Sequence, residues 1–213
     1  MDRYDPDCRI GLMVDEWGTW YDVEEGTNPG FLYQQNTIRD ALVAGINLNI
    51  FNKHCDRVKM ANIAQLVNVL QAVILTEGEK MIKTPTYYVF KMYSAHQDNE
   101  LLESMIDTKK VGIEDEYMVP NLTESASVDM GGKIHLTITN LSLDEEAMVE
   151  SVLLGESVKG VTAEIVKGKM DAHNTFDNPD EVKIEKFSNI SFKNDKIRYT
   201  IPPCSVLHIE AEV

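Results

Sequence analysis

Cysteine is scarce in this chain, and the few cysteines present form no pattern. The 213 residues include three cysteines, Cys8, Cys55 and Cys204, which lie far apart in the sequence. A disulfide framework uses an even number of cysteines, and a structural zinc site uses closely spaced ligands. The sequence therefore predicts no disulfide framework and no metal site, and no residue pattern indicates a cofactor.

Basic residues are also in short supply. The chain has 20 lysines and arginines against 35 aspartates and glutamates, which gives a formal net charge of -15 at pH 7. Nothing in that balance offsets repulsion by phosphates, which argues against nucleic acid and against an anionic membrane as partners. No charge-free apolar run reaches about 18 residues, so we expect no membrane span.

The first residues lack the apolar core of a signal peptide. Met1 to Asp7 are dominated by charged side chains instead. If the chain is natural and complete, the sequence predicts a cytoplasmic protein. If it is a piece of a longer protein, its location is unknown, because its first residue then carries no targeting information.

The most informative segment is residues 13–21, which read MVDEWGTWY. The apolar run from Ile10 to Val14 predicts a buried strand over residues 9–16, which would deliver Glu16 into an aromatic pocket formed with Trp17 and Trp20. Sugar-cleaving sites need an ionised carboxylate near an anomeric carbon, with flat apolar faces beside it. The alternative is a strand that ends in a solvated acidic turn, and the residues alone leave both readings open.

The rest of the first half alternates helix and strand. Turn-forming residues predict a loop over 22–30, and apolar residues at spacings of three and four predict a helix over 33–53. Residues 57–75 are apolar almost throughout, which fits a buried strand or a buried helix. A further helix is predicted over 86–97, beginning after Pro85.

From about residue 100 the pattern changes to short strands. Residues 133–139 alternate polar and apolar side chains with period two after the turn at Gly131 and Gly132. Similar strands are predicted near residues 147–154, 161–167, 182–187, 196–201 and 204–212. Short strands at this spacing indicate an antiparallel β-sandwich. The sequence thus predicts an α/β piece over 1–97 and an all-β piece over 98–213.

Several motifs in the first piece resemble those of the family 51 α-L-arabinofuranosidases. They comprise MVDEWGTWY at 13–21, NPG at 28–30, RDAL at 39–42, His54, DRVKMAN at 56–62, QLVNV at 65–69 and TPTYYVF at 84–90. The resemblance is dense from about Gly11 to His96 and thinner to the end, and its motifs are highly specific. It implies a (β/α)8 barrel followed by a β-sandwich, with this chain as the C-terminal part. It also favours a barrel strand near 57–65, followed by a long loop.

The resemblance also implies roles for individual residues. Glu16 would be the nucleophile of a retaining hydrolase that releases terminal α-L-arabinofuranosyl residues from arabinan or arabinoxylan oligosaccharides. Gln65 would hydrogen-bond the sugar, although a structural amide is the alternative, and Trp17 and Trp20 would line the pocket. The family takes its acid/base from an Asn-Glu pair at a strand end, whereas Asn99-Glu100 here follows a predicted helix and is interpreted as a coincidence.

A complete barrel needs about 250 residues, and the first piece supplies only the last two strand–helix units. We therefore expect an N-terminal barrel portion, or a homo-oligomer, as partner, and an inactive chain without that portion. The sandwich could still anchor the first piece as a flat layer. The alternatives are a non-catalytic sandwich module, structural or carbohydrate-binding, and a truncated reading frame. Residues 98–213 contain no Trp, which favours a structural role for the sandwich.

Overall fold

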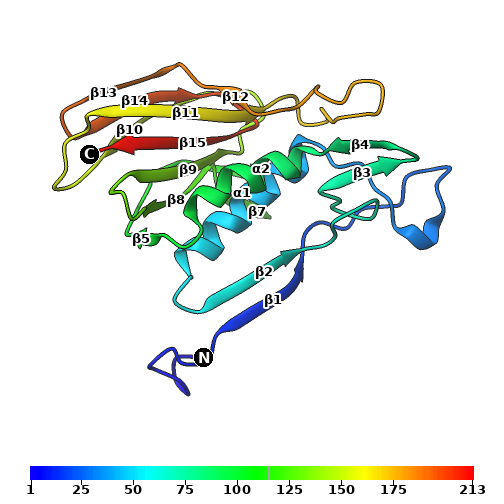
Figure 1. Ribbon diagram of the computed structural model, residues 1–213, viewed down its shortest axis with the longest axis horizontal. Coiled ribbons are helices and arrows are strands. Elements are labelled where there is room, and N and C mark those ends of the chain that lie inside the picture. The colour runs from blue at the N-terminus through cyan, green and yellow to red at the C-terminus, as the bar shows by residue number, and fades with distance from the viewer. Residues whose placement is uncertain (115) are drawn as a thin grey trace.

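The computed structural model describes residues 1–114 and 116–213. Near the N-terminus, strands β1 (Leu12–Trp17) and β2 (Val58–Ile63) form a two-stranded parallel sheet that stands apart from the other strands (Figure 1). Met13 pairs with Met60 and Trp17 with Ile63, with irregularities between them. Both predicted strands are therefore present and lie side by side.

The prediction that the first strand is buried is wrong for this chain. Along β1, Leu12 is 42% exposed and Met13 is 55% exposed, and Met60 on β2 is 41% exposed. The physical reason is the small size of the sheet. Each strand has one neighbour only, so the apolar side chains on the side turned away from the helices meet no other element.

The helix predicted over 33–53 is present as α1 (Ile38–Lys53), and it begins later because Thr37 caps it. The Thr37 side chain accepts a hydrogen bond from the first turn, while the Asp40 side chain accepts one from the Thr37 backbone. This reciprocal pair satisfies amides that a helix start leaves unpaired. The preceding loop contains a short 3-10 helix, η1 (Pro29–Phe31).

The long loop predicted after the second strand contains a hairpin that the sequence did not indicate. It is formed by β3 (Ile74–Glu77) and β4 (Lys80–Lys83). Helix α2 (Pro85–Tyr93) and the 3-10 helix η2 (Ser94–His96) follow, close to the helix predicted over 86–97.

The second half is a β-sandwich, as predicted. One sheet has six strands in the order β12-β11-β15-β9-β8-β5, and the other has three in the order β10-β14-β13. In chain order the strands are β5 (Glu100–Leu102), β8 (Leu122–Val128), β9 (Ile134–Asn140), β10 (Ala147–Val152), β11 (Gly160–Lys167), β12 (Glu185–Lys186), β13 (Ile190–Lys193), β14 (Lys196–Ile201) and β15 (Ser205–Glu212). A separate hairpin joins β6 (Lys110–Ile113) and β7 (Tyr117–Pro120).

Two apolar cores cover the two faces of the six-stranded sheet. Ile138, Ile165 and Leu207 face the three-stranded sheet, where they meet buried side chains of β14 such as Ile201. On the opposite face, α1 and α2 pack side by side against the sheet (Figure 1). This second core joins the two halves of the chain, and its members include Ile38, Leu42, Val89, Met92, Val166 and Val206.

Part of the contact between α1 and the sheet is polar. Asn49 donates to Thr123 Oγ1 at 3.1 Å, and Lys53 donates to Glu124 Oε1 at 2.5 Å. Both strand residues belong to β8, which the sequence analysis did not predict. Its polar side chains bind polar groups of the helix, so the strand lacks an apolar-polar alternation.

Candidate functional site

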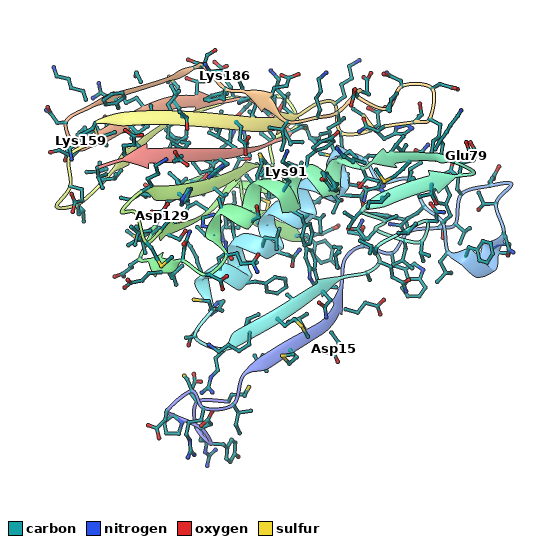
Figure 2. All side chains as sticks on the ribbon, viewed as in Figure 1. Asp15, Glu79, Lys91, Asp129, Lys159 and Lys186 are labelled. Atoms are coloured by element: carbon teal, nitrogen blue, oxygen red, sulfur yellow. The ribbon has the colours of Figure 1, made fainter. Side chains whose placement is uncertain are left out.

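The structure brings two of the predicted site residues to the same end of the β1–β2 pair. Glu16 lies near the carboxyl end of β1, and Gln65 follows β2. Because the strands are parallel, their carboxyl ends meet at one edge, and the Ala64 amide donates to the Trp17 carbonyl at 2.9 Å. The side chains of Glu16 and Gln65 are both exposed. Neighbouring Asp15 is exposed too, and Figure 2 shows it beside β1 on the side away from the helices.

The two tryptophans have different surroundings. The Trp17 ring stacks on Phe90 with ring centroids 6.0 Å apart and meets Phe51 edge-on at 5.4 Å, so it packs under both helices. Its indole nitrogen is buried without a hydrogen-bond partner among the described residues. Trp20 is 70% exposed. Of the two rings, Trp20 is therefore the one that is open to a ligand.

A buried polar network links the loops beyond the two strands. Thr19 Oγ1 donates to Asp40 Oδ1 at 2.9 Å, and Gln71 Nε2 donates to the same oxygen at 2.5 Å. Asp40 and Gln71 are both 0% exposed. Gln34 extends the network, because its Oε1 accepts from the Tyr21 amide at 2.8 Å and its Nε2 donates to the Thr19 carbonyl at 3.2 Å.

Sequence reasoning missed this network. The spacing of Thr37 and Asp40 does suggest a helix start, but the contact of Asp40 with two distant loops leaves no local pattern. Gln71 carried a weak signal, since it is a single amide within an otherwise apolar run from Val69 to Leu75. An amide that interrupts such a run needs a buried partner, which Asp40 provides.

Arg39 holds the loop that follows Glu16 from its outer side. Its guanidinium carbon lies 3.6 Å from the centroid of the Tyr21 ring, and its Nη2 contacts Asp40 Oδ2 at 3.1 Å. Arginine over an aromatic face is an attractive arrangement. The segment that follows Glu16 is therefore held from both sides, by buried hydrogen bonds and by this stacked cation.

A hollow of about 460 Å³ lies beyond these loops, between η1 and the β3–β4 hairpin. Its lining combines three aromatic rings, Phe31, Tyr33 and Phe176, with polar groups that include Asn28 and Glu77. Burial, with a smaller contribution from the charge of Glu24, raises the pKa of Tyr33. The phenol therefore stays protonated and available as a donor at neutral pH.

Asn99-Glu100 is the dipeptide that we interpreted as a coincidental match to the family's acid/base motif. Asn99 lies in the turn after η2, and Glu100 is the first residue of β5. Asn99 Nδ2 donates to the Ala95 carbonyl at 2.7 Å, and Glu100 pairs with Val128 at the edge of the six-stranded sheet. Within residues 1–114 and 116–213, no group of three or more His, Cys, Asp or Glu side chains could hold a metal ion. No helix in the same ranges is long and apolar enough to cross a membrane.

Solved structures that resemble this chain are glycoside hydrolases. The family 51 arabinofuranosidase from Xanthomonas axonopodis pv. citri superposes with a TM-score of 0.95 and 40% identity, over 100% of this chain and 43% of that one. The α-L-arabinofuranosidase from Thermotoga maritima, solved with arabinose, gives a TM-score of 0.83 and 26% identity over 95% of this chain and 43% of that one.

The chain belongs to the family described as the alpha-L-arabinofuranosidase C-terminal domain, which matches residues 15–205. It is 42% identical to an intracellular exo-alpha-L-arabinofuranosidase of Bacteroides ovatus over 213 residues, which are 100% of this chain and 41% of that protein. An intracellular exo-alpha-(1->5)-L-arabinofuranosidase of Bacillus subtilis is 30% identical over 68% of this chain and 30% of its own length. The chain thus spans less than half the length of these relatives.

Proposed function

We propose that this chain is the C-terminal portion of a retaining α-L-arabinofuranosidase. Its substrates would be terminal α-L-arabinofuranosyl residues of arabinan or arabinoxylan oligosaccharides. The observation that carries the proposal is the position of Glu16 at the carboxyl end of a parallel strand, inside the region that matches the family. Barrel glycosidases place their catalytic carboxylates at such strand ends.

In this proposal β1 and β2 are the last two strands of a (β/α)8 barrel, with residues 1–97 in the barrel and 98–213 in the sandwich. The parallel pairing and the exposed side chains of both strands support this assignment. A groove of about 520 Å³ lies between β2 and α2, lined by apolar side chains such as Ile63, Leu66 and Phe90, with Lys91 beside them. Figure 2 shows Lys91 on α2. We assign this groove to the first strand–helix unit of an N-terminal barrel portion.

Glu16 would act as the nucleophile. Its carboxylate oxygen forms a bond with the anomeric carbon while the glycosidic carbon–oxygen bond breaks. The leaving oxygen takes a proton from a second carboxylic acid, about 5 Å away, which the N-terminal portion would supply. Water then attacks the same carbon, gives its proton to that second carboxylate, and releases arabinose and Glu16. Without the second acid the chain alone is inactive.

Gln65 and Trp20 would bind the sugar beside Glu16. The Gln65 amide donates to the Leu70 carbonyl at 2.7 Å, so its backbone is held while its side chain remains exposed. Trp20 would offer its open ring to a sugar face. Trp17 would border the pocket only with the part of its ring left free, since the ring stacks on Phe90 and meets Phe51 in a T-shaped contact. Like the relatives described as intracellular, the assembled enzyme would act inside the cell.

The test is a fusion that restores a complete barrel. The part of the Bacteroides ovatus relative that precedes its matched region is joined to this chain, and hydrolysis of 4-nitrophenyl α-L-arabinofuranoside is measured. The fusion should be active, and the chain alone should not. Glu16→Ala in the fusion should lower activity by several orders of magnitude, whereas Glu25→Gln in the exposed loop should leave it unchanged.

Azide separates a nucleophile from a structural carboxylate. In the Glu16→Ala fusion, azide can occupy the vacated space and attack the anomeric carbon directly, giving an arabinosyl azide of inverted configuration. Recovery of that product supports the assignment of Glu16. An inactive parental fusion that nevertheless folds would refute the proposal and favour a non-catalytic sandwich module.

A further inference from the structure

One buried carboxylate holds both loops that leave the strand pair. Oδ1 of Asp40 accepts hydrogen bonds from Thr19, in the loop that follows Glu16, and from Gln71, in the loop that follows Gln65. Gln71 Nε2 also contacts Thr19 Oγ1 at 2.5 Å, which closes a three-membered cluster. Residues far apart in sequence thus meet at a single oxygen atom.

The second oxygen of the same carboxylate has a different task. Oδ2 accepts from the Thr37 amide at 2.8 Å and from Arg39 Nη2 at 3.1 Å, both at the start of α1. Capping a helix needs only this oxygen. Asp40 therefore uses one oxygen to begin the helix and the other to hold the loops.

The two loops also touch each other closely. A Cβ atom added to Gly18 would lie 2.7 Å from Cγ of Gln71, so a larger residue at position 18 would force the loops apart. Gln71 has φ 53°, a left-handed conformation that a non-glycine residue adopts only when its surroundings hold it there. The contact with Asp40 supplies that restraint.

We propose that Asp40 is a positioning residue, which holds the loops after β1 and β2 so that Glu16 and Gln65 face the same sugar. The inference rests on the proposed function and extends it to a residue that touches no substrate. A misplacement of about 1 Å in a catalytic site can cost about 10²-fold in rate. Loss of the Oδ1 contacts should therefore lower kcat while the helix still forms.

Asp40→Asn tests the positioning role of Asp40, because asparagine has nearly the same shape as aspartate. Donors face both oxygens of Asp40, so the new amide group must oppose donors on one side. In the active fusion we expect kcat to fall tenfold or more. Combining Asp40→Asn with Gln71→Glu exchanges donor and acceptor, because the amide can then donate to the carboxylate at position 71 and accept from the Thr37 amide. This double variant should recover most of the lost kcat.

Thr37→Ala is the matched control for the helix cap. It removes the capping hydroxyl, which contacts Asp40 Oδ2 at 3.4 Å, and leaves the Thr37 amide and Arg39 on Oδ2 and both partners of Oδ1 in place. Its urea midpoint should fall while kcat stays at the parental value. If Thr37→Ala and Asp40→Asn lower kcat alike, or if the double variant is no better than Asp40→Asn, Asp40 is only a helix cap and the proposal is wrong.

A spectroscopic readout in the chain itself separates this proposal from the proposed function. The chain has only two tryptophans, Trp17 and Trp20, and they lie on either side of Thr19 in the segment that follows Glu16. Asp40→Asn should change the emission maximum and iodide quenching, and Thr37→Ala should change neither. If the parental fusion is inactive, the proposed function fails, and the fluorescence of the two variants still decides whether Asp40 holds the loop. Unchanged fluorescence in Asp40→Asn overturns the proposal.

Discussion

Gly45 lies on α1 close against β9 and β15 of the six-stranded sheet, and Gly45→Ala tests how tightly the two halves of the chain pack. A Cβ atom at this position would lie 2.4 Å from Thr139 Oγ1 and 3.2 Å from Val206 Cγ2. Alanine is otherwise the better residue in a helix. The variant therefore sets helix propensity against packing at a point where the two effects have opposite signs.

The magnitudes favour packing. Replacing glycine by alanine within a helix gains about 0.8–1.0 kcal/mol of stability. Relieving a contact of 2.4 Å requires α1 or β9 to move by several tenths of an ångström, and overpacking of this kind costs about 1–3 kcal/mol. We expect Gly45→Ala to lower the free energy of unfolding by about 1 kcal/mol, measured by urea unfolding followed by circular dichroism at 222 nm.

Substitutions of Thr139 identify the cause. Thr139→Ala removes the closest neighbour of the new methyl group and leaves Val206 Cγ2 at 3.2 Å. Gly45→Ala in that background should therefore stabilise the protein by about 0.5–1 kcal/mol, at or somewhat below the helix-propensity value. Thr139→Val keeps the shape of threonine and should preserve the loss. If Gly45→Ala stabilises the parental chain, α1 does not lie as close to β9 as the structure indicates, and the reasoning fails.

Three further predictions concern a histidine, the N-terminal segment and the core. Burial, reinforced by two nearby histidines, lowers the pKa of His96 to about 3, below its value of about 6.5 in the unfolded chain. The free energy of unfolding should therefore fall as the pH drops from about 6.5 toward 3, by up to about 1.4 kcal/mol per pH unit. His96→Asn should flatten this slope in urea titrations at several pH values. Arg57 is 7% exposed and contacts Asp5 Oδ2 at 2.6 Å, which anchors the N-terminal segment. Arg57→Lys should loosen that segment and speed trypsin cleavage after Arg9. An unchanged cleavage rate would contradict the anchoring role of Arg57. Met92 is 1% exposed in the core between the helices and the sheet. Met92→Ala should lower the free energy of unfolding by about 2–5 kcal/mol, and a loss below about 1 kcal/mol would indicate a looser core.

Local patterns predicted the elements in which buried positions carry apolar side chains and exposed positions carry polar ones. Strands near 196–201 and 204–212 alternate polar and apolar side chains, and they appear as β14 and β15 within a residue of the predicted bounds. The strand near residues 9–16 is likewise present as β1, whereas the strand near 57–65, present as β2, was favoured by the family resemblance because its local pattern also fitted a helix. The start of α1 was predicted too early, since its cap at Thr37 depends on a reciprocal contact with Asp40.

The missed elements are those whose polar side chains are buried against other polar groups. β8 reads LTESASV, and Ser125 within it is 0% exposed because Asn49 and Asn52 of α1 bind its hydroxyl. A polar strand of this kind shows no apolar-polar alternation. Its burial becomes evident only from its contacts with α1. The β3–β4 hairpin was missed because its two four-residue strands, ILTE and KMIK, lie on either side of the polar turn at Gly78, and neither alternates polar and apolar side chains.

Local patterns in the sequence were enough to predict the all-β second half, the position of Glu16 at a strand end, and membership of the arabinofuranosidase family. Periodicity and motifs of a few residues suffice for these, because each records a local environment. The folded chain was needed to show that α1 and α2 cover the sandwich sheet, that β1 and β2 stay exposed, and that Asp40 joins two loops. Those features depend on contacts between residues distant in the chain, and burial of polar groups by one another leaves no pattern within either segment.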